Sequence, residues 1–317
     1  MKNKAVRLQR KEQASGMLAA SIPLIGFALF SLIPLILSAV ISFTELHSTD
    51  LTEMKFIGFD NYLTILTNAD DGRTYASYLS TVVYALNAPL CIALALWIAY
   101  MINKSKIGKR FFRSAFFIPY VCSTVVISLT FRNMLYRLEG GVLNDLLVNL
   151  GFEPVRWLVD MENPMIFMIS AVVMTVWSGL GWCIVLFQAA LANVDQSYYE
   201  AARIDGASDA QMFWKITWPA ISPTTAYLFT MKLIWAFQSM AEMHILAENS
   251  GGAPTWGNSG AWVSDTVVKH IYNMIFHSSH QFGYGLAAAA GWILAIIILI
   301  ITRINLRAQK RWVNYDF

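Results

Sequence analysis

The sequence predicts an all-α membrane protein that crosses the bilayer six times. The first observation is composition: 56% of the 317 residues are hydrophobic and only 14% are charged, whereas soluble domains usually carry about 25% charged residues. The second is that the charges are clustered, so that long stretches hold almost none. The third is that basic residues gather on alternate connections between the apolar stretches, as the positive-inside rule requires.

Six apolar stretches each come close to the roughly 20 residues that a helix needs to cross the hydrocarbon core. The second is typical, because the chain from Leu79 to Ile102 contains no Asp, Glu, Lys or Arg. We therefore expect helical spans at 17–43, 79–102, 113–135, 165–189, 223–247 and 285–303. These spans divide the chain into a basic N-terminal segment (1–16), a transmembrane domain (17–303) and a C-terminal tail (304–317).

The first apolar run superficially resembles a secretory signal. It is too long for the apolar region of such a signal and lacks a convincing small-x-small cleavage site. We therefore expect it to be retained as the first transmembrane helix.

Basic residues indicate which side of the membrane each connection faces. The N-terminal segment, the connection between the second and third spans, the C-terminal tail, Arg203 and Lys215 together hold 16 of the 23 basic residues. By the positive-inside rule these parts are cytoplasmic, and so are both termini. Insertion topology accounts for the basic flanks, so they imply no nucleic-acid partner. The opposite connections hold five basic residues: Lys55, Arg73, Arg137, Arg156 and Lys269.

The outer connections carry two local signals. The connection from Tyr136 to Pro164 contains leucines and a valine at helical spacing, which predicts a short interfacial helix over 142–150. The segment from Glu248 to Tyr284 contains a turn cluster at 250–254.

The inner segment 190–222 is predicted to form two short helices joined by a turn. Ser197 and Glu200 have the spacing of a capping box at the start of the first helix. Gly206 suits the left-handed position that closes that helix. Ser208 and Gln211 form a second capping box, and Pro219 is expected to stop the second helix.

This segment also carries a longer pattern, which resembles the EAA loop of binding-protein-dependent ABC importer permeases. Glu-Ala-Ala alone would carry no information, but the later elements at their expected spacing make the match specific. The match is continuous and consists of Glu200-Ala201-Ala202, Asp205-Gly206-Ala207, Phe213, Ile216, Pro219 and Pro223.

Other stretches are similar to the carbohydrate branch of that family, the maltose and glycerol-3-phosphate type. They are 56–62 in the first outer loop, 116–119 at the start of the third core helix and 141–144 in the second outer loop. The cluster 250–254 departs slightly from the family's usual Thr-Gly-Gly-Gly-Pro. The last two elements indicate the first of two paired permease subunits.

The resemblance implies a fold and a set of partners. The fold would be that of a type I ABC importer permease in a bacterial inner membrane, with 190–222 forming cytoplasmic coupling helices. The partners would be a second permease subunit, two cytoplasmic ATPase subunits and an extracellular or periplasmic sugar-binding protein. ATP and Mg would be held on the ATPase subunits, so this chain is expected to bind no cofactor and to catalyse no reaction.

The resemblance also assigns roles within the loop. Glu200 would pair with a basic ATPase residue, and Gly206 would make the sharp turn. The alternative is that Glu200 merely caps its helix and Gly206 merely ends it, and both interpretations can hold together. The residues assigned to ATPase coupling are Glu200, Ala201, Ala202, Asp205, Gly206, Ala207, Phe213 and Pro219.

The fifth span is the most polar and supplies the candidate substrate-binding residues. Trp235, Gln238 and Glu242 stand at i, i+3 and i+7, on one face of a helix. An aromatic ring beside an amide and a carboxylate suits a polyhydroxyl ligand. The alternative is interhelical polar packing. Lys232 lies nearer the cytoplasmic end and could snorkel toward water.

Two other functional classes compete with a permease subunit. An ion-coupled secondary transporter would need an ion or proton relay, and Lys232 and Glu242 alone are weak evidence for one. A membrane enzyme would need a nucleophile and base, and no convincing pair is present. The chain lacks a Gly-x-x-x-x-Gly-Lys-Ser/Thr phosphate loop. No cysteine–histidine spacing resembles a zinc site, so no metal is expected.

Overall fold

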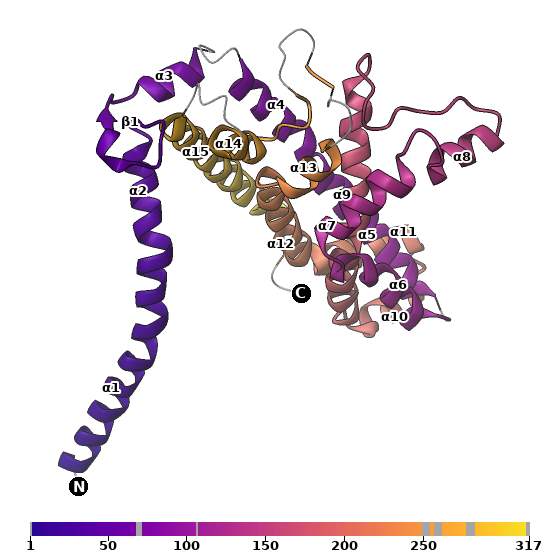
Figure 1. Cartoon of the computed structure of the whole chain (residues 1–317). Helices are drawn as coiled ribbons and strands as arrows, with labels where there is room; N and C mark the ends of the chain where they lie inside the picture. The colour runs from indigo at the N-terminus through magenta and orange to yellow at the C-terminus, as the bar shows by residue number, and fades with distance from the viewer. Residues whose placement is uncertain are drawn as a thin grey trace.

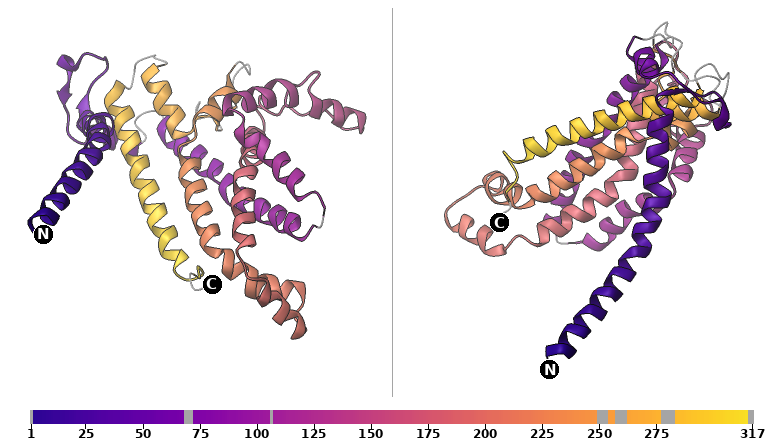
Figure 2. Two further views of the ribbon diagram at one scale, coloured as in Figure 1. Left: turned by 90° about the horizontal axis from the view of Figure 1, so that it is seen from below. Right: turned by 90° about the vertical axis from the view of Figure 1, so that its left-hand side faces the viewer.

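The structure is a helical bundle from which the N-terminal helix stands apart. The computed structural model describes residues 2–67, 72–105, 107–248, 254–256, 262–276 and 283–314. Figure 1 shows the helices gathered into one body, with the N-terminal helix leaving it at one side. The left-hand view in Figure 2 shows the same separation.

The first span is one long helix, made of α1 (Lys2–Phe27), a wide π turn η1 (Ala28–Leu32) and α2 (Ile33–Ile41). Its helical character confirms the prediction for 17–43. None of its most apolar 18-residue stretch is buried against the rest of the chain. Apolar surface of this extent needs lipid or another protein around it.

A small antiparallel sheet holds the outer end of this span. β1 (Thr44–Glu45) pairs with β2 (Lys55–Phe56) across the 3₁₀ turn η2 (Leu51–Glu53), and α3 (Asp60–Leu66) follows. The buried side chain of Asn61 donates hydrogen bonds to two backbone carbonyls at the start of this loop, at 3.0 and 2.9 Å. The loop therefore closes around the end of α2.

The second span runs from Arg73 to Lys104 and is long and apolar enough to cross a membrane. It consists of α4 (Arg73–Ala85) and α5 (Asn87–Lys104), which are interrupted at Leu86. The structure extends the predicted span 79–102 by several residues toward its outer end.

The third predicted span, 113–135, is wrong as a single straight helix. α6 (Lys109–Val121) ends at Cys122, and α7 (Thr124–Thr130) with the π turn η3 (Phe131–Leu135) leaves it at an angle of 96°. Pro119 lies just before the bend. Because proline has no N–H and its ring displaces an earlier carbonyl, it weakens the last turn of α6.

The centre of the bundle is α9 (Pro164–Ala192), which agrees with the predicted span 165–189. It packs against α5, α6 and α12, and these contacts enclose the largest apolar cluster. The second outer loop contains α8 (Val142–Asn149), which confirms the predicted helix there.

The segment after α9, which is predicted to be cytoplasmic, contains α10 (Gln196–Ile204) and α11 (Asp209–Met212). The helix of α11 continues through a π turn, η4 (Phe213–Thr217), into α12 (Trp218–Phe237). After a break, α13 (Ala241–Ala247) follows. The predicted span 223–247 is therefore wrong as one helix.

The last two helices are α14 (Val267–Phe276) and α15 (Gly283–Gln309), which lie side by side (Figure 1). α15 agrees with the predicted span 285–303. The predicted turn cluster at 250–254 lies, except for its last residue, outside the described part of the chain.

Among the described residues, four helices are long and apolar enough to cross a membrane. The bent pair formed by α6 with α7 and η3 makes five if it is one span. The fifth predicted span is not among them, because α12 ends at Phe237. Six crossings therefore remain a prediction.

Small residues set the distance between the central helices. Ala95, Cys91 and Cys183 are fully buried where α5 meets α9. On the opposite side of α9, a β-carbon on Gly181 would lie 2.3 Å from the carbonyl oxygen of Phe116 in α6. The glycine is thus needed for the close approach of two backbones.

We expect Gly181→Ala to destabilise the protein by about 1–3 kcal/mol, the usual cost of overpacking a core. The physical reason is that the backbone of α6 must move to admit the methyl group. The measurement is the apparent melting temperature of the purified protein in detergent. Gly291→Ala is the matched control, because its new β-carbon would meet Ile271 Cδ1 at an ordinary 3.6 Å. Equal melting temperatures for the two variants would contradict this account.

Candidate functional site

The candidate site is the loop formed by α10, α11 and η4, which we call the coupling loop. Its first helix begins two residues earlier than the sequence suggests. Asp195 is the N-cap, and its carboxylate accepts a 2.9 Å hydrogen bond from the Ser197 N–H, which lowers the pKa of Asp195. The predicted capping box of Ser197 and Glu200 is therefore wrong, because Ser197 already lies in the first turn.

The turn after α10 has the geometry that the glycine predicts. Gly206 has φ of 75°, a left-handed conformation that a residue with a β-carbon disfavours. The Ala207 N–H donates to the Ala202 carbonyl at 2.9 Å, and the Gly206 N–H donates to the Arg203 carbonyl at 3.1 Å. This pair of bonds is a Schellman motif, which satisfies the carbonyls left free at the helix end. The turn is thus fixed by backbone bonding.

The second helix starts with the predicted capping box. The Ser208 hydroxyl accepts from the Gln211 N–H at 3.3 Å, and the Gln211 side chain accepts from the Ser208 N–H at 2.8 Å. Both short helices are therefore capped at their N-termini, so the loop is rigid on either side of Gly206.

Pro219 was expected to stop this helix, and that prediction is wrong. The helix continues past Pro219, because the wide turn of η4 stands immediately before it. Proline cannot donate a backbone hydrogen bond, and a π turn is one of the ways in which a helix accommodates such a gap. Residues 209–237 consequently form one uninterrupted helical rod.

The exposed side of the coupling loop carries four of the eight residues assigned to ATPase coupling. Glu200, Ala201, Asp205 and Gly206 are exposed, while Ala202, Ala207, Phe213 and Pro219 are half-buried. Ile204, which sequence reasoning did not single out, is 87% exposed. The sequence could have indicated Ile204, because it is a large apolar residue between polar neighbours in this loop. Together these residues form a surface with both charge and an apolar centre.

The opposite side of the loop is anchored to the bundle. The hydroxyls of Tyr199 in α10 and Thr217 in η4 are 2.9 Å apart and hydrogen-bonded. Met212 and Thr217 are buried. Further along, Trp218 stacks on Trp312 of the C-terminal tail at 5.9 Å between ring centroids. The Tyr199–Thr217 bond therefore ties α10 to η4, and the loop is held to the bundle because Tyr199 and Ile216 pack against the central apolar cluster.

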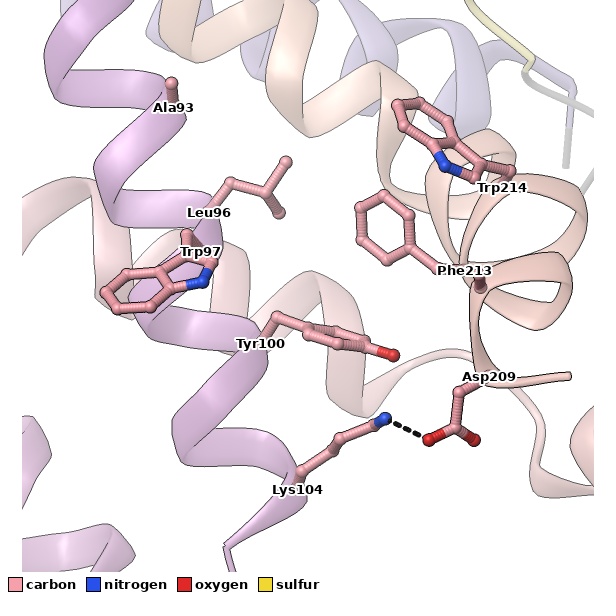
Figure 3. A pocket seen from close by; sticks show the side chains of 9 residues that line it. Ala93, Leu96, Trp97, Tyr100, Lys104, Asp209, Phe213 and Trp214 are labelled. Atoms are coloured by element: carbon pink, nitrogen blue, oxygen red, sulfur yellow. Dashed lines mark hydrogen bonds and ion pairs between the residues drawn. The ribbon is translucent and has the colours of Figure 1, made fainter.

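A groove separates the coupling loop from α5. Its volume is about 540 Å³, and Figure 3 shows the side chains that line it. At one end of the groove the Lys104 ammonium lies 2.7 Å from the Asp209 carboxylate, and this pairing lowers the pKa of Asp209. The residues that line it are Ala93, Leu96, Trp97, Tyr100, Lys104, Asp209, Ala210, Phe213 and Trp214.

The candidate substrate-binding residues are only partly brought together. Trp235 and Gln238 are both exposed at the outer end of α12. Glu242 lies beyond the helix break, in α13, where its carboxylate accepts a 3.0 Å hydrogen bond from the Ser239 hydroxyl. The predicted single helical face is wrong for Glu242, because α12 ends at Phe237 and the i+7 spacing no longer applies.

The structure places two further aromatic side chains beside Trp235. The ring centroid of Trp182 in α9 lies 4.9 Å from the ring centroid of Trp235 and 6.2 Å from that of Tyr227. These three rings form an aromatic row along α9 and α12. Sequence reasoning missed Trp182, because no pattern in a single sequence shows which residues of two helices face each other.

Lys232 does not snorkel. Its side chain is buried. A β-carbon on Gly179 would lie only 2.1 Å from the Lys232 ammonium, so the ammonium group occupies space that the glycine leaves free. Within the described ranges, no group of three or more His, Cys, Asp or Glu side chains is placed to hold a metal ion.

Comparison with known proteins gives the chain a family. Residues 91–314 match the family model of the binding-protein-dependent transport system inner membrane component. The chain is 31% identical to the probable ABC transporter permease protein YesP of Bacillus subtilis, over 99% of this chain and 96% of the relative. It is 32% identical to the arabinooligosaccharides transport system permease protein AraP of the same organism, over 89% and 84%.

A third relative and a solved structure agree. The lactose transport system permease protein LacF of Rhizobium radiobacter is 28% identical, over 96% of each chain. The fold is similar to that of a chain in a crystal structure of a bacterial alginate ABC transporter in complex with an alginate-bound periplasmic protein. The TM-score is 0.76 at 22% identity, with 96% of both chains covered. The chain therefore belongs to the family of binding-protein-dependent transport system inner membrane components, and the predicted all-α permease fold is confirmed.

Proposed function

We propose that this chain is the membrane-spanning permease subunit of an ATP-driven importer of a sugar or oligosaccharide. The observation that carries the proposal is the coupling loop: a rigid, doubly capped turn whose exposed face presents the EAA-type motif. The names of AraP and LacF, which refer to oligosaccharide and lactose transport, support the substrate class. The ion-coupled alternative, which would need a relay of Lys232 and Glu242, gains no support from the structure. The buried Lys232 lies in α12, before the helix break, whereas Glu242 lies in α13, after it.

The partners follow from the same proposal. Two cytoplasmic ATPase subunits receive the coupling loop, and they hold the ATP and Mg, so that this chain binds no cofactor and hydrolyses nothing. A second permease subunit completes the pathway, and the unburied first span offers apolar surface for it or for lipid. An extracellular or periplasmic sugar-binding protein delivers the substrate. The alginate transporter of similar fold, which was crystallised in complex with an alginate-bound periplasmic protein, supports this arrangement.

Within the coupling loop, Glu200 faces a basic residue of the ATPase and Gly206 sets the direction of the second helix. Ile204 adds the apolar centre of the docking surface. Ala201, Ala202, Asp205 and Ala207 complete that surface, while Phe213 and Pro219 lie on the rod behind it.

The first prediction from the proposed function concerns this loop. Glu200→Lys reverses the charge offered to the ATPase, and Gly206→Pro cannot adopt the positive φ that the turn needs. Both variants should insert in the membrane yet lose uptake of radiolabelled lactose and arabino-oligosaccharides, together with binding-protein-stimulated ATP hydrolysis, in proteoliposomes holding the complete complex. Copurification of the ATPase then separates failed docking from failed transmission. Uptake at wild-type level in both variants would remove the main support for the proposed function.

The second prediction concerns orientation in a bacterial inner membrane. With six crossings both termini are cytoplasmic, as the distribution of basic residues indicates. In a background without Cys91, Cys122 and Cys183, an impermeant thiol reagent should label Glu153→Cys in intact spheroplasts. It should label Lys310→Cys only after permeabilisation. Both positions are exposed, so access to the reagent depends on sidedness. External labelling of Lys310→Cys would invalidate the topology.

The third prediction concerns the substrate pathway. We propose that the aromatic row of Tyr227, Trp182 and Trp235, with the Gln238 amide beside it, contacts the sugar, while Glu242 orders the adjoining helix break through Ser239. Trp235→Ala should reduce sugar uptake without loss of assembly or basal ATP hydrolysis, because a flat ring supplies apolar contact with a sugar face. Trp235→Tyr should retain more activity.

The matched control for the aromatic row is Leu299→Ala, which removes an exposed apolar side chain from α15. It should transport normally. If Trp235→Ala and Gln238→Ala both transport like the wild type across a range of sugar concentrations, the row is a packing feature and the pathway lies elsewhere.

A further inference from the structure

The coupling loop touches α5 at two neighbouring points. The Lys104 ammonium in the last turn of α5 lies 2.7 Å from the carboxylate of Asp209, the first residue of α11. One turn earlier on α5, the ring of Tyr100 meets the ring of Phe213 edge-on, with 5.1 Å between centroids. The Lys104 ammonium also lies 4.9 Å from the Tyr100 ring centroid. Figure 3 shows these four side chains gathered at one end of the groove.

Beyond these contacts the two elements diverge. The remainder of the groove, about 540 Å³ in total, extends between Ala93, Leu96 and Trp97 on one side and Trp214 on the other. The contact between the loop and α5 is thus concentrated at the cytoplasmic end. A concentrated contact of this kind acts as a point of attachment between the loop and α5.

α5 itself is fixed firmly to the centre of the bundle. Its buried alanines, together with Cys91, lie in the same apolar cluster as α9 and the inner half of α12. A β-carbon on Gly179 of α9 would lie 3.4 Å from Cys91 Sγ, which shows how closely the helices approach. Because packed interiors transmit displacement with little compression, any movement of the end of α5 is passed to α9.

We infer that Lys104 and Asp209, with the Tyr100–Phe213 ring contact, form a link that transmits movement of the coupling loop to α5. We call these four residues the α5–α11 link, and the inference rests on the proposed function. Lys104 and Asp209 are positioning residues in this scheme: they hold the loop against α5 and touch neither the sugar nor ATP. Their side chains are 46% and 69% exposed, and such exposed pairs contribute little to folding stability. Reversal of the pair should therefore leave the fold intact.

The test uses charge reversal within the complete complex of both permease subunits, the ATPase and the binding protein. Lys104→Asp and Asp209→Lys each replace the wild-type ion pair of 2.7 Å with two like charges, and the double variant restores attraction with the sides exchanged. Each single variant should retain basal ATP hydrolysis but lose binding-protein stimulation by at least about fivefold, the lower end of typical coupling between distant sites. The double variant should regain most of it. Lys310→Asp, the same charge change on an exposed residue of the tail, should behave as the wild type.

A second measurement reports the movement itself. Nitroxide labels at Leu94 on α5 and Ala210 on α11 lie on exposed positions on either side of the link. In the wild type the distance between them should stay constant when ATP and vanadate trap the ATPase, because the link makes the two elements move together. In either single variant the distance should shift by more than the width of the wild-type distribution. Should a reversal prevent assembly, Lys104→Met and Asp209→Asn remove the attraction without creating repulsion.

The outcomes separate the link from the proposed function. Normal stimulation in both single variants, or a double variant no better than the singles, overturns the link. A wild-type distance that changes on trapping overturns it as well. Glu200→Lys and Gly206→Pro are measured in parallel: if they abolish stimulation while the link variants do not, the link alone is wrong. If all four variants are stimulated normally, the proposed function is wrong too.

Discussion

The close packing of α9 against its neighbours is the constraint on which the rest of this structure depends. A membrane interior offers no hydrophobic drive between helices, so association relies on van der Waals contact and on small residues that let backbones approach. Gly179 and Gly181 serve two sides of α9, toward Lys232 of α12 and toward the backbone of α6. Ala95 and Cys91 of α5 serve the contact of that helix with α9. The unit of α5, α6, α9 and α12 is therefore the solid part of the molecule, to which both the coupling loop and the candidate sugar site are attached.

The coupling loop depends on hydrogen bonding in the same way as the bundle depends on packing. Its first helix, α10, is too short to be stable alone, since isolated helices under about 12–15 residues are marginal in water. Caps at Asp195 and Ser208, the Schellman bonds around Gly206 and the Tyr199–Thr217 bond compensate for that. With its backbone bonded internally, the loop can leave Glu200 and Ile204 exposed for a partner.

Local chemistry was readable from the sequence, whereas relations between distant residues were not. The spans at 17–43, 165–189 and 285–303, the left-handed Gly206 and the Ser208 capping box follow from periodicity and side-chain type, and the structure confirms them. The errors concern proline and helix ends. Pro219 continues a helix that it was expected to stop, because a π turn precedes it. The break after Phe237 separates Glu242 from Trp235, and no proline or glycine marks it. Trp182 and the Lys104–Asp209 pair depend on tertiary contacts, which a single sequence does not display.

The continuity of the helix past Pro219 has a mechanical consequence. Residues 209–237 form one rod of about 42 Å, at about 1.5 Å per residue. Its inner end is the second helix of the coupling loop, and its outer end carries Trp235 and Gln238. A tilt imposed at one end therefore displaces the other without any intermediate element. The rod ends at Phe237, and hydrogen bonds of Ser239 order the break that follows. The Ser239 carbonyl accepts a 2.7 Å hydrogen bond from the Thr266 hydroxyl, and the Ser239 hydroxyl donates to the Glu242 carboxylate. Because of this break, α13 with Glu242 is not part of the rod that carries Trp235. In the proposed importer, a tilt of the coupling loop would therefore displace Trp235 and Gln238 within the candidate sugar site.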